Sequence, residues 1–254
     1  MFFLKRLKKK FEKKYFWTKY PNIAKFLCKG NGLEVGALSC PHKFHPDCKI
    51  SFADINNESG LRNVLDNFPE KIYEGKLVKL DYILKKPKYL FEQIKNNTFD
   101  FVYSSHCLEH SLNPIATLVD QIRITKSGGI IYTSIPNKKY TYDKNRTTTS
   151  ISKLIDKFQK KIFYITEEEA TEIIRNTKDH PLYDKYQDKN DEIKKYAKEI
   201  ADSFDGIHHI HTYDQNNVIE ILNYLVKNNS CSIIYFAGFN ENKNLDLNFA
   251  IQKN

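Results

Sequence analysis

The sequence predicts an α/β protein in which a mostly parallel sheet of seven strands carries helices on both faces. Short apolar segments of strand composition alternate with stretches of helical periodicity from Gly32 to about Ser134. Several of these segments end on a glycine or an acidic residue, as strands do where the chain turns into the next helix. No stretch approaches the roughly 20 consecutive apolar residues that a membrane-spanning helix needs.

Capping and turn residues separate the expected elements. Asn113-Pro114 supplies an N-cap and a first-turn proline for the helix after the fourth strand, and Gly128-Gly129 makes the turn into the fifth. The last two strands are expected to form an antiparallel pair. Strands are expected at 33–36, 50–54, 77–81, 99–105, 130–135, 230–236 and 245–251, and helices at 58–68, about 114–126 and 214–227.

Residues 146–205 interrupt this alternation. They contain charged helical stretches at 166–175 and 191–204 and few strand signals. Because no linker-like composition separates them from their surroundings, we interpret them as a helical insertion after the fifth strand. The insertion then belongs to a single domain over residues 21–254.

Residues 1–20 form a distinct basic segment. Lysines and Arg6 fill most positions between apolar residues that recur at helical spacing, namely Phe3, Leu4, Leu7, Phe11 and Tyr15. The pattern predicts a basic amphipathic helix. We favour a helix that packs its apolar stripe on the domain. The alternative is a helix that lies on an anionic surface, such as the inner face of a membrane.

The composition is that of a globular protein, with 41% apolar residues. Five scattered cysteines argue against a disulfide framework, and the N-terminus lacks the features of a signal peptide, so we expect a cytoplasmic protein. The net charge of +9 suits a phosphorylated acceptor, although a general richness in lysine explains much of it. No nucleic-acid-binding motif is present, and nucleic acid is not an expected partner.

Candidate ligand-binding residues stand where the expected strands end. In an open parallel sheet, ligands bind beyond the carboxyl ends of the strands, where the strand order reverses. Gly36 ends the first strand and lets the backbone approach a ligand closely. Asp54 ends the second strand and is placed to accept hydrogen bonds from both hydroxyls of a ribose. Asp81 ends the third strand, within reach of a purine amino group or a ribose.

Five stretches, spanning about half of the chain, resemble class I S-adenosylmethionine-dependent methyltransferases, particularly those of methyltransferase type 11. They are GLEVGALSCP (32–41), FADI (52–55), LVKLD (77–81), FDFVYSSHCLEHSLNPI (99–115) and SGGIIYTSIPNKKYTYDKNRTTTS (127–150). The resemblance implies a Rossmann-like sheet with a reversed last strand and S-adenosyl-L-methionine as the cofactor. The absence of a G-x-G-x-x-G motif argues against NAD or FAD.

The resemblance also implies where the cofactor lies. Glu34, Gly36 and Ala37 would border its methionine part. The family usually carries two or three glycines in this turn, whereas residues 38–40 are Leu-Ser-Cys here. This departure indicates a divergent subgroup in which a G-A-L-D/S-x-P turn replaces the glycines.

The rest of the cofactor would lie along the next two strands. Asp54, with Ile55 beside it, would hold the ribose. Asp81 and Tyr82 would border the adenine.

The segment PNKKYTYDKNRTTTS (136–150) resembles methyltransferases found with genes for capsule and other surface polysaccharides. In those proteins a segment after the fifth strand contributes to the acceptor site. Tyr140, Tyr142, Asp143 and Arg146 are therefore candidate acceptor contacts. The alternative is an ordinary polar loop with a helix cap at Ser150 or Ser152.

Histidines are the candidate proton acceptors. A hydroxyl acceptor must lose its proton during methyl transfer, and imidazole can accept it near neutral pH. The resemblance places Ser105 and His106 beside the sulfonium and the acceptor. His208, His209 and His211 follow the insertion and could close over the acceptor, so the base is His106 or one of these three.

Two patterns could bind a metal ion, although we expect no metal site. Residues 106–110 (His-Cys-Leu-Glu-His) match the H-x-x-E-H pattern of zinc peptidases, which requires a helix, whereas a loop is expected here. His110 then contacts the acceptor or supports the loop with Glu109. A second set of zinc-capable side chains lies within one tight loop that closes a tetrahedron only with difficulty, namely Cys40, His42, His45 and Cys48.

Together these observations predict an S-adenosylmethionine-dependent methyltransferase. The expected acceptor is a saccharide hydroxyl or a phosphate-like oxygen, in the biosynthesis of a capsule or another surface glycan. The alternative is a non-catalytic Rossmann-like binding module held at a membrane surface by residues 1–20. A zinc hydrolase is a third hypothesis.

Overall fold

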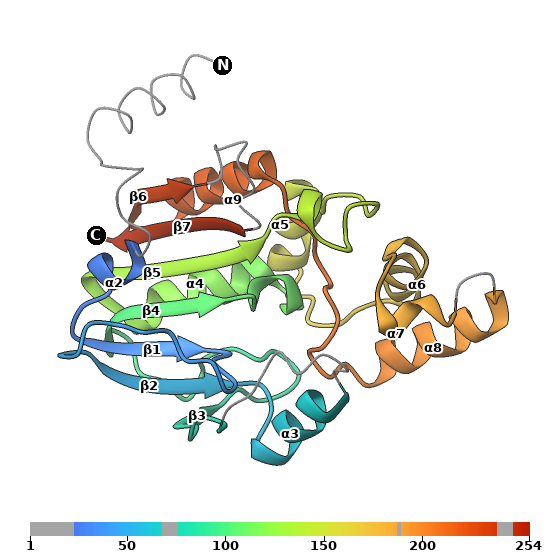
Figure 1. Cartoon of the computed structure of the whole chain (residues 1–254). Coiled ribbons are helices and arrows are strands. Elements are labelled where there is room, and N and C mark those ends of the chain that lie inside the picture. The colour runs from blue at the N-terminus through green and yellow to red at the C-terminus, as the bar shows by residue number, and fades with distance from the viewer. Residues whose placement is uncertain (1–22, 68–75, 187–188, 238–245) are drawn as a thin grey trace.

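The computed structural model describes residues 23–67, 76–186, 189–237 and 246–254, and the helix expected at 1–20 lies outside them. Its centre is a seven-stranded sheet in the order β3-β2-β1-β4-β5-β7-β6 (Figure 1). β7 runs antiparallel to β5 and β6, and the other pairings are parallel, so the predicted fold class and the reversed last strand are confirmed. The strands are β1 Asn31–Val35, β2 Lys49–Asp54, β3 Tyr82–Ile83, β4 Phe99–Ser105, β5 Thr125–Pro136, β6 Cys231–Ala237 and β7 Asp246–Lys253.

The strand order reverses between β1 and β4. From β1 the chain continues outward through β2 to β3, whereas β4 pairs on the other side of β1 and leads to β5. A ligand site is therefore expected beyond the carboxyl ends of β1 and β4. Figure 1 shows the helices α6, α7 and α8 at this same end of the sheet.

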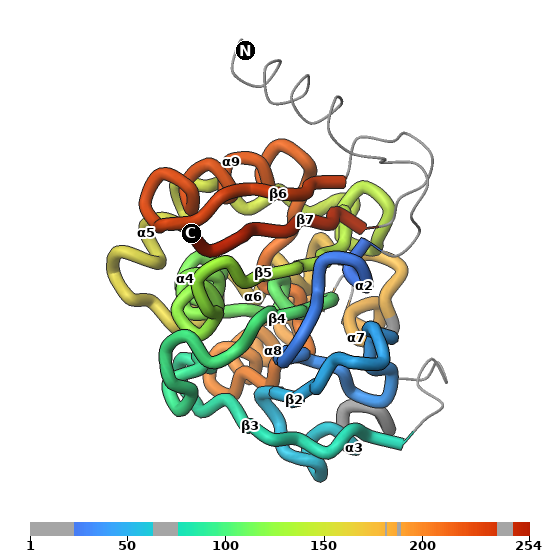
Figure 2. Tube along the Cα trace, turned by 90° about the vertical axis from the view of Figure 1, so that its left-hand side faces the viewer, coloured from blue at the N-terminus to red at the C-terminus, as the bar shows by residue number. Residues whose placement is uncertain are grey.

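The two faces of the sheet carry different covers. Side chains such as Leu33 and Val102 pack on one face. The next residues along β1 and β4, Glu34 and Tyr103, lie opposite each other on the other face. Three helices cover the first face, α4 Pro114–Ile124, α5 Ile151–Gln159 and α9 Gln215–Asn228. The short helix α2 Ile23–Leu27 and the loop around Phe44 lie on the second, opposite α4 and α9 (Figure 2).

Side-chain caps fix where these helices begin. The Asn113 side chain accepts a hydrogen bond from the backbone N–H of Ala116 at 3.1 Å, and Pro114 occupies the first turn, as predicted. Ser150 caps α5 in the same way, so the helix cap named as an alternative is present. The Asp214 side chain accepts from the N–H of Asn217 at the start of α9.

The helices α6 Glu167–Asn176, α7 Pro181–Asp184 and α8 Asn190–Asp202 form a lobe with its own apolar core. Thr166 and Glu169 form a reciprocal capping box at the start of α6. α5 also lies within the predicted insertion at 146–205, but its Leu154 packs in the core of the sheet. The lobe proper therefore begins after α5.

The expected third strand at 77–81 is wrong. The observed β3 comprises Tyr82 and Ile83, because the Asp81 side chain accepts the backbone N–H of Phe52 at 2.9 Å and takes the place of a strand carbonyl. None of the helices among the described residues is both long and apolar enough to cross a membrane. The remaining helical elements are α3 Glu58–Asn67 and the two short turns η1 Leu108–His110 and η2 Lys138–Tyr140.

Candidate active site

A pocket of about 360 Å³ opens at the carboxyl ends of β1, β2 and β4, where the strand order reverses. A volume of this size lies within the range of small-molecule sites. One part of its wall comes from the ends of the strands. The other part comes from the segments 141–142 and 204–209, which lie beside the α6–α8 lobe.

The turn after β1 brings the backbone close to the pocket. Gly36 lines it with a φ of +73°, and a Cβ at this position would lie 2.4 Å from the sulfur of Cys107. Leu38 also lines the pocket and has a φ of +50°, in the left-handed region that glycine occupies without strain. The missing family glycine is thus replaced by a leucine that keeps the glycine-like conformation.

Asp54 lies in the wall of the pocket with Ile55 and Asn56. Its side chain is buried and accepts the backbone N–H of Asn56 at 3.2 Å. Burial raises its pKa from 3.8 to about 6. A carboxylate at this strand end can accept hydrogen bonds from two neighbouring ligand hydroxyls.

Glu34 and Ala37 do not line the pocket among the described residues. Glu34 shares a sheet face with Tyr103, and its Oε1 accepts the backbone N–H of His42 at 2.9 Å. Burial raises the pKa of Glu34 from 4.5 to about 7. Glu34 therefore holds the loop after β1 on the face opposite Val35.

The predicted adenine contacts lie at the edge of the sheet. Asp81 is exposed, and its side chain accepts a hydrogen bond from the backbone N–H of Phe52. Tyr82 packs edge-on against Phe99 with ring centres 6.3 Å apart. Ser105 ends β4, and its carbonyl accepts the thiol of Cys107. None of the predicted residues Asp81, Tyr82 and Ser105 is among those that line the pocket.

His106 lines the pocket directly after β4. Its φ of +53° is a strained conformation of the kind found at functional sites. Its Nε2 lies 3.1 Å from Oδ1 of Asp246 at the start of β7, and this contact raises the pKa of His106. Nδ1 lies 3.6 Å from Oε1 of the buried Glu109 and is the nitrogen left to accept a proton from a ligand.

The other end of the pocket is lined by Tyr142, His110 and His209. His209 Nδ1 lies 2.6 Å from Asp143 Oδ2, and the Tyr142 hydroxyl lies 3.0 Å from His209 Nε2. Burial lowers the pKa of His110 well below its usual range, which keeps the ring neutral. Three of the predicted acceptor-side residues thus come together here.

Asp143 and Arg146 lie behind this wall. Both are buried, and Arg146 donates to Asp143 Oδ1 at 3.0 Å and to the carbonyl of His209 at 2.6 Å. Burial alone would raise the pKa of Asp143, but the contacts with His209 and Arg146 outweigh it and lower that pKa. Both residues position His209, whereas Tyr140 is 37% exposed and outside the pocket lining.

His208 and His211 are not among the residues that line the pocket. His208 Nδ1 lies 2.6 Å from the hydroxyl of Tyr183 in the core of the lobe. His211 is 1% exposed, with Nδ1 3.3 Å from the Thr149 hydroxyl, and burial lowers its pKa to about 3. Of the four histidines predicted as bases, His106 and His209 line the pocket.

Sequence reasoning missed the partner of His106 and several residues that line the pocket. Asp246 was part of an expected strand, and nothing in its local pattern connects it with His106. Cys107, Tyr89 and the 204–207 segment also line the pocket without being named as candidates. These residues reach the pocket because segments distant in the sequence come together in the fold, which the spacing of apolar residues cannot show.

The pocket fits a nucleoside cofactor that carries an amino acid. It combines a close backbone approach at Gly36, a carboxylate at Asp54 and apolar walls from Leu38, Ile55 and Leu61. These are the features that a ribose and a purine require of an open α/β sheet. These are therefore the residues that could hold S-adenosylmethionine.

The methyltransferase domain family matches residues 63–133 of the chain. No curated protein matches it. Among solved structures, a methyltransferase from Methanosarcina mazei is 16% identical with a TM-score of 0.46, covering 92% of this chain and 97% of that one. The plantazolicin methyltransferase BpumL, in complex with SAH, is 13% identical with a TM-score of 0.45, covering 97% and 90%.

A structure described as a putative zinc-dependent alcohol dehydrogenase from Rhodobacter sphaeroides is 14% identical with a TM-score of 0.49, covering 90% of this chain and 86% of that one. TM-scores below 0.5 add nothing to a functional assignment. The assignment follows from the family match, the sheet order and the pocket at the strand ends. The chain is an S-adenosylmethionine-dependent methyltransferase with the class I fold.

Proposed function

We propose that this methyltransferase transfers the methyl group to an oxygen of a saccharide or phosphate-like acceptor, as in the biosynthesis of a capsule or another surface glycan. The observation that carries the proposal is His106, which lines the pocket with its Nε2 3.1 Å from Oδ1 of Asp246. A hydroxyl is a weak nucleophile that must lose its proton as it reacts, and this pair offers a place for the proton.

S-adenosylmethionine supplies an electrophilic methyl group on a sulfonium. Nδ1 of His106 would take the proton that the acceptor oxygen loses when it receives the methyl group and S-adenosylhomocysteine leaves. Asp246 holds Nε2 of the same ring at 3.1 Å and thereby fixes the tautomer that leaves Nδ1 unprotonated. The residues otherwise act by positioning, which accounts for much of the rate of such displacements.

The polar part of the pocket lining suits a ring-shaped acceptor. Tyr142 offers an aromatic ring and a hydroxyl, and Thr141, Ser111 and His110 add polar groups around it. A few converging polar groups on an apolar wall are typical of sites that fix the orientation of a small ligand. The surface-glycan assignment itself is supported by the resemblance of residues 136–150.

The test is methyl transfer from labelled S-adenosylmethionine to simple glycosides and nucleotide sugars, with matched amino sugars in which nitrogen competes with oxygen. We expect the product to carry an O–CH₃ group by NMR. Transfer to nitrogen alone, or no transfer to any saccharide by protein that binds S-adenosylhomocysteine, would contradict the proposal.

The role of His106 has its own test. His106→Gln should lower kcat by about 10²–10⁴-fold while the KM for S-adenosylmethionine changes little, because a base acts in the chemical step. His45→Gln, at a partly exposed histidine distant in sequence, serves as the matched control. An equal effect of both substitutions, or an unchanged kcat in His106→Gln, would remove His106 from the proposed reaction.

A further inference from the structure

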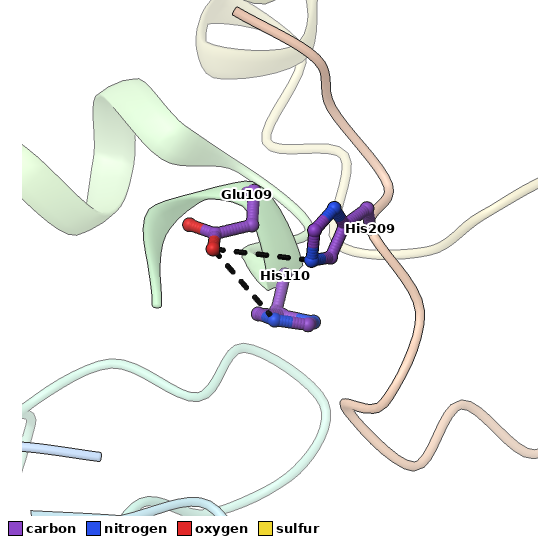
Figure 3. Close-up of side chains that lie close together, drawn as sticks. All are labelled: Glu109, His110 and His209. Atoms are coloured by element: carbon purple, nitrogen blue, oxygen red, sulfur yellow. Dashed lines mark ion pairs between the residues drawn. The ribbon is translucent and has the colours of Figure 1, made fainter. Parts of the chain in front are cut away.

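Three potential metal ligands converge at the acceptor end of the pocket (Figure 3). Glu109 and His110 come from the turn η1 after β4, and His209 comes from the segment between α8 and α9. Glu109 Oε1 lies 3.9 Å from His110 Nε2 and 4.0 Å from His209 Nε2. The three ligand atoms all lie within 4.8 Å of one another.

Glu109 is the unusual member of this group. Its side chain is fully buried, and neither carboxylate oxygen has a hydrogen-bond partner among the described residues. A buried carboxylate is expensive to maintain unless it is paired, hydrogen-bonded or bound to a metal. Within the described part of the chain, this carboxylate thus has imidazole nitrogens of His106, His110 and His209 at 3.6–4.0 Å but no hydrogen bond.

In both histidines, a hydrogen bond at Nδ1 orients the ring so that Nε2 faces Glu109. His110 Nδ1 lies 3.0 Å from the carbonyl of His208, and His209 Nδ1 lies 2.6 Å from Asp143 Oδ2. Each of these acceptors takes an N–H from Nδ1 and so leaves a lone pair on Nε2. Metal-binding histidines are held by such a carbonyl or carboxylate on the far side of the ring. Arg146 in turn fixes Asp143 by an ion pair at 3.0 Å.

We propose that Glu109, His110 and His209 bind one divalent cation of the first transition row, such as Zn²⁺. Two imidazoles and one carboxylate are ligands that such ions share, and three protein ligands leave coordination positions open for substrate. A cation about 2.0–2.2 Å from each ligand atom separates those atoms by roughly 3.0–3.6 Å, so small side-chain movements close the site. The cation displaces the Tyr142 hydroxyl from His209 Nε2.

The position of the cation gives it a task in the proposed reaction, and this part of the inference rests on the proposed function. His110 and His209 line the pocket, so the open positions face the acceptor. A bound cation would hold an acceptor oxygen and lower the pKa of its hydroxyl. Neighbouring oxygens on one saccharide ring could occupy two positions together, which would favour acceptors with vicinal oxygens.

The competing cation site from the sequence is not assembled. In the loop at 40–48, the His42 ring packs on Tyr103 and Phe44, and Cys48 donates to the carbonyl of Cys28. The group at Glu109 is the set of three or more convergent ligands found among the described residues. The inference therefore departs from the sequence-based expectation of no metal.

The test is calorimetric titration of the chelator-treated full chain with Zn²⁺, in the absence of cofactor and acceptor. We expect one site per chain with micromolar or tighter affinity. Glu109→Gln should weaken binding by at least about tenfold, since it removes the one charged ligand. His45→Ala, in the competing loop, is the matched control and should bind as the wild type does.

A melting measurement guards against variants that fail to fold. Glu109→Gln keeps the shape of the side chain and removes a buried charge, so its metal-free melting temperature should not fall below that of the wild type. Zn²⁺ should raise the melting temperature of the wild type and His45→Ala, and leave Glu109→Gln unchanged. No binding by the wild type, equal binding by Glu109→Gln, or lost binding in His45→Ala would each overturn the inference.

The two proposals fail separately. Zn²⁺ binding without transfer to any saccharide leaves the metal site standing and removes the acceptor class. Transfer to a saccharide by protein that binds no Zn²⁺ removes the metal site and leaves the acceptor class.

Discussion

Glu34→Gln should stabilise the protein at alkaline pH and have little effect near pH 5. The Glu34 side chain is 3% exposed, and its Oε1 accepts the N–H of His42. Its Oε2 has no hydrogen-bond partner among the residues that the structure describes. Burial raises its pKa from 4.5 in the unfolded chain to about 7 in the folded protein. The folded state therefore favours the protonated form of this carboxyl group.

The magnitude follows from the two pKa values. Between pH 4.5 and 7 the folded protein binds more protons at Glu34 than the unfolded chain does, so the free energy of unfolding falls as the pH rises. A difference of about 2.5 pKa units corresponds to about 3 kcal/mol, reached above pH 7. Glutamine keeps the acceptor for His42 and cannot ionise, so the variant lacks this loss.

Urea unfolding followed by circular dichroism at pH 5, 6, 7 and 8 measures the difference. We expect wild type and Glu34→Gln to be nearly equal at pH 5, and the variant to gain about 3 kcal/mol by pH 8. Glu58→Gln, at an exposed ion pair with Arg62, is the control and should change stability by less than about 1 kcal/mol at every pH. A difference that does not change with pH, or a less stable variant at pH 8, would refute the reasoning.

Three further substitutions probe the pocket. Asp54→Asn should weaken S-adenosylhomocysteine binding about 10-fold or more by calorimetry. It should also abolish a fall in wild-type affinity below about pH 6, where the carboxylate becomes protonated. Gly36→Ala should destabilise the protein by about 1–3 kcal/mol, and by more than Gly128→Ala does. Both glycines have a positive φ, but a Cβ at Gly36 would also meet the sulfur of Cys107. Equal losses of stability in thermal melts of the two variants would contradict this expectation. Arg146→Ala should lower the free energy of unfolding in urea by about 3–5 kcal/mol, since it leaves the buried Asp143 carboxylate without its cationic partner. A loss below about 1 kcal/mol would argue against the ion pair.

The fold was predictable because its signals are local. The proline and the side-chain cap at Asn113 start α4 as expected, and the capping box at Thr166 starts α6 within one residue of its predicted position. Strand ends marked by Gly36 and Asp54 also lie at the pocket. The prediction of the third strand failed because the side chain of Asp81 replaces a backbone hydrogen-bond acceptor, which a pattern of apolar residues does not reveal.

The site was less predictable because its contacts join distant segments. His106 acquires its partner from β7, and His209 acquires its partner from the loop after β5. The pattern of residues 136–150 predicted Asp143 and Arg146 as acceptor contacts, and it gave no sign of their contacts with His209. Burial decides between these roles, and burial depends on the whole fold.

Arg146 makes the lobe and the acceptor site a single unit. Its guanidinium donates to Glu172 on α6, to Asp143, and to the carbonyl groups of His209 and Ile210. An arginine fork with this many acceptors holds its partners in fixed relative positions. A displacement of α6 would therefore move His209, and with it the acceptor wall, while the strand ends around Gly36 and Asp54 stay in place. This arrangement lets the lobe vary with the acceptor without disturbing the half of the pocket that we expect to hold the cofactor.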